Sequence, residues 1–292
     1  MRISTAYQYD TYNREIRQAQ QRYFQAHREV TTGKRLNTPS DDPYGTSVVL
    51  SAGGLKAAAA QYTANLRSAK DYLTFTESAL DESHGILREA YNISVRANQT
   101  TVDQEARDGM ANQVREMKKR LIDLGNTRGA SGQYIFAGQM SNTKPFDASS
   151  GTLAFNGDNN DIAVETSAAE TTVVNSAGEQ RFKAAWDALD QLETNLRSGT
   201  TGATESDIIN TQNQMKSFRS EWGLVGSKLT RIQEIGRHHE RRIDELVGQI
   251  SDIEEVDMAE AITKLQQTEV AYTAALQVGS QGFKLSLMDF IR

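Results

Sequence analysis

The sequence predicts a mainly α-helical fold: an elongated antiparallel helical bundle or coiled coil with paired N- and C-terminal helices and a small central β insertion. Only three of the 292 residues are proline, and because proline costs about 3 kcal/mol inside a helix, long stretches are free to be helical. Apolar residues recur there at alternating steps of three and four. Residues 125–178 are instead rich in Gly, Ser, Thr, Asn and Asp, a composition typical of turns and short strands.

The composition excludes several classes of protein. Hydrophobic residues make up 38% of the chain and aromatic residues 7%, which suits long helices that each bury one narrow stripe. The net charge is −6 with both signs interspersed, so we expect no nucleic-acid partner. The absence of cysteine excludes disulfides, thiolate metal sites and a cysteine nucleophile. No stretch has the length of a membrane span or the pattern of a cleavable signal peptide, so we expect no membrane insertion.

The first predicted helix follows a weak heptad pattern over residues 9–30. Its apolar or small positions are Tyr9, Tyr12, Ile16, Ala19, Tyr23, Ala26 and Val30. Gly33 follows as a natural C-terminal stop. A turn then spans residues 38–43, in which Asp42 is the expected N-cap of the next helix and Pro43 its first residue.

The helix that begins at Pro43 keeps the three-four alternation for about six heptads. Its positions are Val48, Ala52, Leu55, Ala59, Tyr62, Leu66, Ala69, Leu73, Thr76, Leu80, Ser83, Leu87 and Ala90. Residues 99–101 interrupt the pattern, and Thr101 with Gln104 fits a capping box for a second helix. That helix should fold back antiparallel, with Ala106, Met110, Val114, Met117, Leu121 and Leu124 on one face.

The region after Gly125 predicts a small β insertion. Residues 133–137, 152–155 and 162–166 have the pattern of short strands separated by turn residues. Asn156 and Gly157 lie between two apolar segments, which predicts a hairpin turn.

The C-terminal half returns to helix at about Glu179, with Phe182, Ala185, Leu189, Leu192 and Leu196 on one face. After a loop at residues 198–204, a longer helix keeps the alternation at Met215, Phe218, Trp222, Val225, Leu229, Ile232, Gly236, His239, Ile243, Leu246, Ile250 and Ile253. The register changes over residues 251–257, where Ser251 with Glu254 fits a cap. The last pattern then reads Met258, Ile262, Leu265, Glu269, Tyr272 and Leu276, followed by an amphipathic end with Leu285, Leu287 and Phe290.

This order is nearly palindromic, which favours pairing the two ends with each other and the two long helical regions with each other. We therefore expect three parts: residues 1–40 with 255–292 as terminal assembly helices, residues 41–130 with 179–254 as a long helical bundle, and residues 131–178 as the β insertion.

No motif points to catalysis, a cofactor or a metal. The histidines, His27, His84, His238 and His239, lack partners at the spacing of a helical metal site, so we interpret them as core or flank residues. The loop that starts at Asp158 has Ala169 where a calcium loop needs a carboxylate. The glycine-rich residues 125–132 follow a helix and lack the lysine of a phosphate-binding loop. We predict that the chain is not an enzyme.

The energetics of the ends predict an assembly interface. Seven seam positions over residues 9–30, two of them alanine, each contribute roughly 1.5–3 kcal/mol when buried. Ordering the backbone costs roughly 1–2 kcal/mol per residue, so both terminal segments should be disordered in the monomer and fold against neighbouring subunits. A stable intramolecular helix pair is the alternative. The predicted interface comprises Tyr9, Tyr12, Ile16, Tyr23, Val30, Met258, Ile262, Leu265, Tyr272, Leu276, Leu285, Leu287 and Phe290.

Several motifs at both ends resemble the flagellin superfamily. They are the start MRIST, the segments TTGKRLNTPSDDPYG (31–45) and NTRGASGQYIFAG (126–138), and the C-terminal segments VGSKLTRIQ (225–233) and DIEEVDMAEAITKLQQTEVAYTAALQVG (252–279). They occur in the family's order and at its distances from the two ends. The resemblance covers roughly residues 1–140 and 220–292 and does not extend to the central β region.

Two branches of the family are distinguished by the turn after the first helix. Filament flagellins typically have Asp-Asp-Ala-Ala-Gly there, whereas this chain has Asp41-Asp42-Pro43-Tyr44-Gly45. That form, with QYIFAG at 133–138, is similar to the branch that joins hook and filament, and a filament flagellin is the alternative. One conservative departure is Glu254-Glu255-Val256-Asp257, where the family more often has a Glu-Asp pair.

The resemblance implies a structural role in bacterial motility and an extracellular location on the flagellum. It implies unfolded export through the flagellar type III apparatus, guided by uncleaved terminal sequence and a cytoplasmic chaperone that binds the C-terminal end. The implied partners are copies of the chain itself in a ring, the first hook-associated protein, flagellin and that chaperone. A secreted helical translocator or adhesin is a more distant alternative, which predicts a membrane-active apolar helix.

Overall fold

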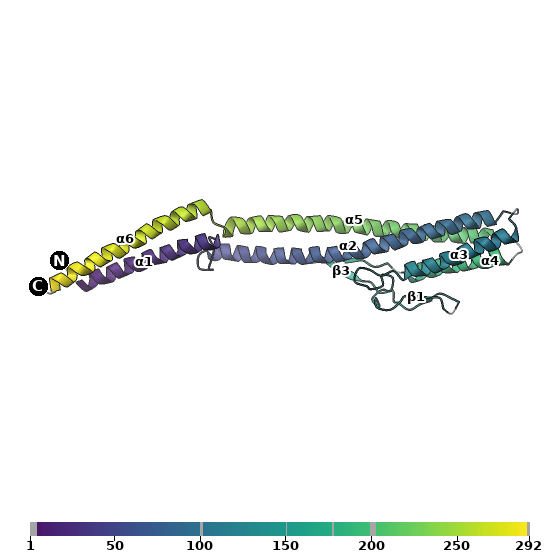
Figure 1. Ribbon diagram of the computed structural model, residues 1–292, viewed down its shortest axis with the longest axis horizontal. Helices are drawn as coiled ribbons and strands as arrows, with labels where there is room; N and C mark the ends of the chain where they lie inside the picture. Colours follow the sequence, from purple (N-terminus) through teal and green to yellow (C-terminus); the bar gives the residue numbers. More distant parts are fainter. Residues whose placement is uncertain (1–4, 100–101, 150, 177, 199–202, 291–292) are drawn as a thin grey trace. The chain divides into compact units, whose positions relative to one another are not determined.

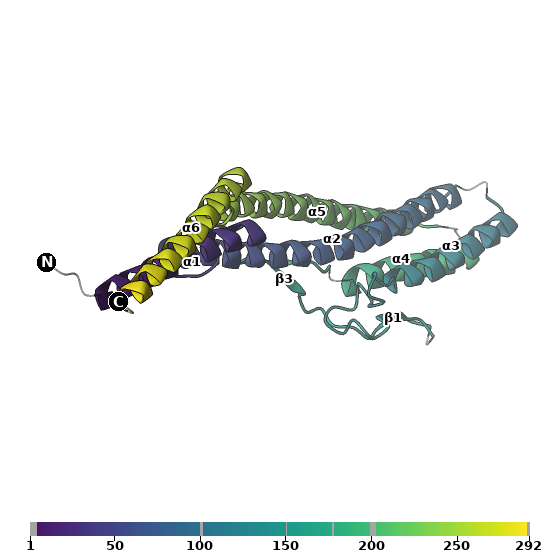
Figure 2. The ribbon, with the colours of Figure 1, turned by 60° about the vertical axis from the view of Figure 1, so that its left-hand side comes forward.

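The computed structural model describes residues 5–99, 102–149, 151–176, 178–198 and 203–290, with side chains except those of residues 5, 6, 8 and 282–290. These residues form the helices α1 (Thr5–Thr32), α2 (Pro43–Ala97), α3 (Gln104–Gly125), α4 (Glu179–Arg197), α5 (Glu205–Glu254) and α6 (Met258–Phe290) (Figures 1 and 2). Four short strands lie between α3 and α4: β1 (Phe146–Asp147), β2 (Ala154–Phe155), β3 (Ala163–Ser167) and β4 (Glu170–Val173). The mainly α fold with a small β insertion is confirmed.

The chain divides into two compact units, each described by itself. Residues 1–58 and 242–292 form the terminal unit, and residues 59–241 form the central unit. This division falls within α2 and α5, whereas the sequence-based boundaries follow the breaks between helices. The three-part division stays a prediction.

Two helix boundaries are formed by the residues that the sequence predicts. Helix α1 ends at Thr32, and Gly33 follows with a φ of +69°, a conformation that glycine adopts without steric cost. Helix α2 begins at Pro43, and the Asp42 carboxylate accepts a hydrogen bond of 2.9 Å from the Gly45 amide. The N-cap assignment of Asp42 is therefore confirmed.

Two predicted caps are wrong. Asp103 caps α3, because its side chain accepts a 2.8 Å hydrogen bond from the Ala106 amide; Thr101 lies outside the described residues. Asp257 caps α6 by accepting from the Ala259 amide at 2.8 Å, whereas Ser251 and Glu254 belong to the last turn of α5. In both cases an aspartate immediately before the helix provides the oxygen.

The core of the central unit lies among α2, α3, α4, α5 and the β insertion. Helices α2 and α5 run antiparallel, since Tyr62 contacts His239 with ring centroids 5.5 Å apart and the Ser94 hydroxyl lies 3.4 Å from that of Thr211. The predicted seams of α2, α4 and α5 are buried or half-buried, apart from Leu55 and Trp222, which are 52% and 36% exposed. The core-facing residues of α3 are Ala111, Val114, Met117 and Leu121.

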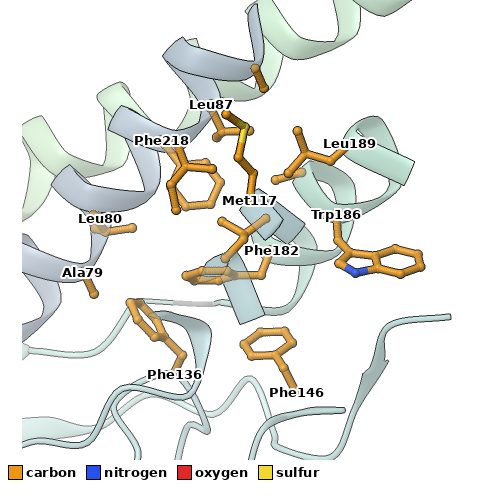
Figure 3. Packing of buried hydrophobic residues seen from close by; sticks show 14 of the residues in the cluster. Ala79, Leu80, Leu87, Met117, Phe136, Phe146, Phe182, Trp186, Leu189 and Phe218 are labelled. Carbon is orange, nitrogen blue, oxygen red and sulfur yellow. The ribbon is translucent and has the colours of Figure 1, made fainter. Parts of the chain in front are cut away.

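An aromatic cluster joins the β insertion to the helices (Figure 3). The Phe182 ring lies 4.9 Å from Phe136, 5.1 Å from Phe146 and 5.3 Å from Phe218 between centroids. All four rings are at most 1% exposed. The contacts with Phe136 and Phe218 are edge-to-face, an arrangement that stabilises aromatic pairs beyond their buried area.

The strand predicted at residues 133–137 is wrong. Tyr134 forms a single isolated β-bridge with Arg128, and the next residues form turns. Ile135, Phe136 and Ala137 are all buried, whereas side chains along a strand would point alternately to opposite faces. We call residues 133–137 the plug. The hydroxyl of Tyr72 on α2 donates a hydrogen bond to the Ile135 carbonyl, and burial raises the pKa of Tyr72 to about 12.

The predicted Asn156–Gly157 hairpin is also wrong. Strand β1 pairs with β2, and β3 pairs with β4, which the sequence pattern missed; β2 and β3 are not paired. Residues after β2 instead run along the plug, where the Asp158 amide donates to the Ala137 carbonyl at 3.0 Å.

Polar side chains attach the β3–β4 hairpin to α2 and α5. Asn65 donates to the Glu165 carbonyl at 3.2 Å, and Nε2 of His239 lies 2.8 Å from the Thr166 carbonyl. Arg231 forms an ion pair with Glu170. His239, a position of the predicted α5 seam, is half-buried.

Glu193 on α4 gives the central unit a pH-dependent contact. Its carboxylate accepts hydrogen bonds from Arg115 at 3.0 Å and Lys118 at 3.2 Å on α3. Burial alone would raise the pKa of Glu193, but the hydrogen bonds from Arg115 and Lys118 outweigh it and hold the pKa below 4.5. A folded pKa below the unfolded value stabilises the fold above pH 4.5, and this stabilisation is lost as pH falls through the folded pKa.

We expect Glu193→Gln to lower the free energy of unfolding by about 1–2 kcal/mol at neutral pH, with the difference from wild type shrinking in acid. Urea unfolding between neutral pH and about pH 3 measures this. Glu89→Gln, an exposed position on α2, is the matched control and should change little. A difference that persists in acid would contradict the role of the charge.

Candidate assembly surface of the terminal helices

Helices α1 and α6 of the terminal unit lie side by side and antiparallel (Figures 1 and 2). The Tyr23 and Tyr272 rings stack with centroids 5.8 Å apart and 13° between planes. Six residues further along α1, the Glu29 carboxylate is buried and accepts hydrogen bonds of 2.8 and 3.1 Å from Lys264. The pairing of the two ends predicted from the sequence is thus present.

The predicted seam of α1 is the side that packs against α6. Along it Ala26 is fully buried, and the other positions are half-buried. Five residues of the predicted interface lie there, at Tyr9, Tyr12, Ile16, Tyr23 and Val30. One neighbouring helix therefore leaves part of each of these side chains accessible.

The seam of α6 that packs against α1 is shifted from the predicted one. It consists of Ala261, Leu265, Thr268, Tyr272, Ala275 and Gly279. Leu265 and Tyr272 belong to both patterns, whereas the predicted seam residue Glu269 is exposed. Small residues at three positions allow close approach of α1, and the prediction followed the larger hydrophobic side chains instead.

The remaining predicted interface residues of α6 divide into two groups. Met258, Ile262 and Leu276 are 43%, 44% and 43% exposed. These three define the outer stripe, which lies beside the seam that contacts α1. The side chains of Leu285, Leu287 and Phe290 lie outside the described ones, although all three residues fall within the span of α6.

Further exposed hydrophobic residues were missed by the sequence analysis. Tyr7 and Phe24 on α1 are 61% and 53% exposed, and Val270 and Val278 on α6 are 67% and 56% exposed. The signal was available, because a helix with apolar residues outside one stripe has more than one face to cover.

The breaks α1–α2 and α5–α6 meet in the terminal unit. The Arg35 amide donates to the Glu254 carbonyl at 2.7 Å, and the Val256 amide donates to the Gly33 carbonyl at 3.1 Å. Lys34 also forms a 2.6 Å ion pair with Glu254. Main-chain hydrogen bonds therefore connect the two chain segments at the base of the α1–α6 pair.

Each aspartate of the Asp41-Asp42-Pro43 motif has a local structural role. The Asp41 carboxylate accepts hydrogen bonds from the Thr38 amide at 2.8 Å and the Asn37 amide at 3.1 Å. The hydrogen bond from the Thr38 amide is the main cause that lowers the pKa of Asp41. Asp42 caps α2 as described above, so the motif fixes a turn and starts a helix.

A pair of glycine variants tests this turn. A β-carbon on Gly45 would lie 2.6 Å from Oδ2 of Asp42 and 3.1 Å from Cδ1 of Leu36, whereas one on Gly53 would meet nothing within 4 Å. We expect Gly45→Ala to destabilise the terminal unit by about 1–2 kcal/mol through loss of the cap. Gly53→Ala should stabilise α2 by about 0.5–1 kcal/mol. Thermal unfolding followed by circular dichroism measures both, and equal effects would contradict the assigned role of the cap.

The described part of the chain has neither a metal-binding cluster nor a membrane-spanning helix. No group of three or more His, Cys, Asp or Glu side chains there could hold a metal ion. Among the same residues, no helix is long and apolar enough to cross a membrane.

The chain is similar to known flagellar proteins. Residues 3–141 match the family model of the bacterial flagellin N-terminal helical region. The chain is 24% identical to flagellar hook-associated protein 3 of Salmonella typhimurium, with 100% of both chains covered, and 25% identical to that of Escherichia coli, with 98% of both covered. Its fold is similar to the crystal structure of Bacillus cereus FlgL, with a TM-score of 0.61, 19% identity and coverage of 69% of this chain and 99% of the other.

Proposed function

We propose that this chain, which resembles the flagellin superfamily, is a structural subunit of the bacterial flagellum that forms the junction ring between hook and filament by helical self-assembly. The observation that carries the proposal is the similarity over the full length of both chains to two proteins named hook-associated protein 3. The proposed role is mechanical and needs no chemical step.

A filament subunit is the second candidate, and the turn before α2 favours the junction role over it. Pro43 is the first residue of α2, directly after the Asp42 cap. The QYIFAG segment, which is also similar to the junction branch of the family, contains the plug. Through the plug the β insertion contacts Tyr72 on α2 and Phe182 on α4. The ring of identical subunits, the first hook-associated protein, flagellin and an export chaperone remain the proposed partners, and unfolded export without a cleaved signal remains the proposed route.

The proposed assembly interface is the predicted residue set, now divided by its surroundings. The half-buried seam between α1 and α6 holds the helix pair together, and the outer stripe of Met258, Ile262 and Leu276 contacts neighbouring subunits. Burial stabilises the α1–α6 helix pair only weakly, because most of its apolar seam residues are half-buried. Each of them contributes correspondingly less than a fully buried side chain. We infer that contacts with neighbours complete the folding of both terminal helices.

A triple variant of the outer stripe tests the interface. We expect Met258→Ser, Ile262→Ser and Leu276→Ser together to abolish incorporation into flagella, because polar side chains cannot replace the apolar contact with a neighbour. Each position is exposed in the isolated chain, so the free energy of unfolding should change by no more than about 0.5 kcal/mol per position. Gln267→Ser with Gln281→Ser, at exposed polar positions of α6, is the control. Normal incorporation of the triple variant would overturn the assignment of the stripe.

Deleting the gene in its host tests the function. The proposal predicts cells with bare hooks and flagellin monomers released into the medium, and restoration of filaments by the wild-type gene. A strain with no filament and no released flagellin would show that this chain is the filament subunit. Normal filaments and swimming would contradict both candidates.

A further inference from the structure

The loop after β2 contains the only asparagine of the chain that is followed by glycine. Of fifteen asparagines, Asn156 alone precedes a glycine, Gly157. An asparagine side chain can be attacked by the main-chain nitrogen of the next residue, and a β-carbon on that residue hinders the approach. Glycine lacks this carbon, so Asn156 has the least hindered neighbour of any asparagine in the sequence.

In the structure, the Asn156 carboxamide and the main-chain nitrogen of Gly157 are both available for this attack. Asn156 is exposed, and within the described part of the chain neither its carboxamide nor the Gly157 amide makes a hydrogen bond. Other asparagines are held in place. Asn126 donates to and accepts from Phe146 with both side-chain atoms, at 2.9 Å each, and Asn175 binds the Asn160 carbonyl and the Ile162 amide in the same way.

We propose that Asn156 is a site of spontaneous deamidation within the folded protein. The Gly157 nitrogen forms a bond with the side-chain carbonyl carbon of Asn156, and the carboxamide nitrogen leaves as ammonia with the proton from the Gly157 amide. Water then opens the resulting succinimide at either carbonyl, which produces aspartate or isoaspartate. No oxidant or reductant takes part, and the reaction accelerates with rising pH because the attacking amide must lose its proton.

The product changes a tightly packed part of the β insertion. A β-carbon on Gly157 would lie 2.7 Å from the Phe155 ring and 2.9 Å from the Ala137 carbonyl oxygen, so Gly157 packs closely against both. The next residue, Asp158, donates from its amide to Ala137 at 3.0 Å and accepts from the Gln139 amide at 2.7 Å. Isoaspartate adds a methylene group to the main chain, which moves Asp158 out of register with both partners.

This modification is independent of the proposed function. It lies in the central unit, and the residues proposed for assembly lie in the terminal unit. We therefore expect deamidated subunits to keep their terminal helices while losing the contacts between the loop after β2 and the plug.

Incubating the purified full-length protein under native, mildly alkaline conditions tests the proposal. Peptide mapping by mass spectrometry should show conversion at Asn156 before any other asparagine. A protein isoaspartyl methyltransferase with labelled S-adenosylmethionine should label the peptide that contains residues 156 and 157. Hydrogen exchange of the Asp158 and Gln139 amides should accelerate in step with the conversion.

Two variants and an unfolded sample make the result decisive. Asn156→Gln should abolish the label, and Asn142→Gln, at another exposed loop position, should leave it unchanged. The same chain in urea gives the rate without structure. Conversion in urea with an intact Asn156 in the folded protein would overturn the proposal, as would faster conversion at any other asparagine.

Discussion

Replacing Phe182 by alanine should lower the free energy of unfolding of the central unit by about 3–5 kcal/mol. Its ring is fully buried and contacts three other phenylalanines from the plug, β1 and α5. Removing it leaves a cavity whose walls belong to separate segments, and these segments cannot close it without moving the β insertion relative to α4. The loss should therefore fall at the upper end of the range for aromatic residues.

Urea unfolding followed by the circular dichroism of the full chain measures this change. Phe75→Ala is the matched control, because Phe75 lies on α2 and is 38% exposed; it should cost less than about 1.5 kcal/mol. Similar losses for the two variants would show that the aromatic cluster does not hold the β insertion on the helices.

Removing residues 255–292 should abolish assembly while leaving the central unit folded. The deletion removes α6, and with it the stacking partner of Tyr23 and the ammonium group that pairs with the buried Glu29. Most of the stability of a helix in a protein comes from packing of its apolar face, and the deletion removes the helix that covers this face of α1, so α1 should lose its helical structure as well. Every residue of the main hydrophobic cluster lies between Leu66 and Ile232, so this deletion removes no part of that core.

Two measurements separate these effects. Complementation of the deletion strain with the truncated gene should yield no filaments. Thermal unfolding of the truncated protein should retain a cooperative transition with the midpoint of the central unit, at a reduced helical signal. Loss of that transition would show that the central unit depends on α6, and normal filaments would show that assembly does not.

Periodicity predicted the long helices because each buries one continuous stripe. The seams of α2, α4 and α5 lie where the three-four alternation places them, and the cap at Asp42 followed from an aspartate placed directly before proline. The caps of α3 and α6 were assigned to residues further from the true helix starts, because serine and threonine with a following acidic or amide residue match the same local pattern.

The sequence predicted where the β insertion lies, but not which of its strands pair with each other. Strands β1 and β2 are two residues long, too short for any alternation to appear in the sequence. The plug at residues 133–137 has the residue types of a strand, and tertiary contacts with Tyr72 and Phe182 determine its conformation instead. Asn156 and Gly157 fit a hairpin locally, but β2 is paired with β1 and leaves them no partner strand.

The contact between α1 and α6 was predicted, but the side of α6 that makes it was predicted only in part. The α1 seam followed from periodicity because tyrosine and isoleucine mark it. On α6 the side that contacts α1 is marked by alanine and glycine, which a hydrophobicity pattern undervalues. The larger residues of the outer stripe lie beside this seam and are 43–44% exposed.

Locating the subunit on intact flagella tests the junction assignment most directly. The chain has no cysteine, so Ser149→Cys, at an exposed position after β1, provides a single labelling site for a maleimide-linked gold particle or fluorophore. We expect one labelled band at the boundary between hook and filament in electron micrographs, and swimming cells that show the variant to be functional. Label distributed along the filament would contradict it and identify the chain as a filament subunit.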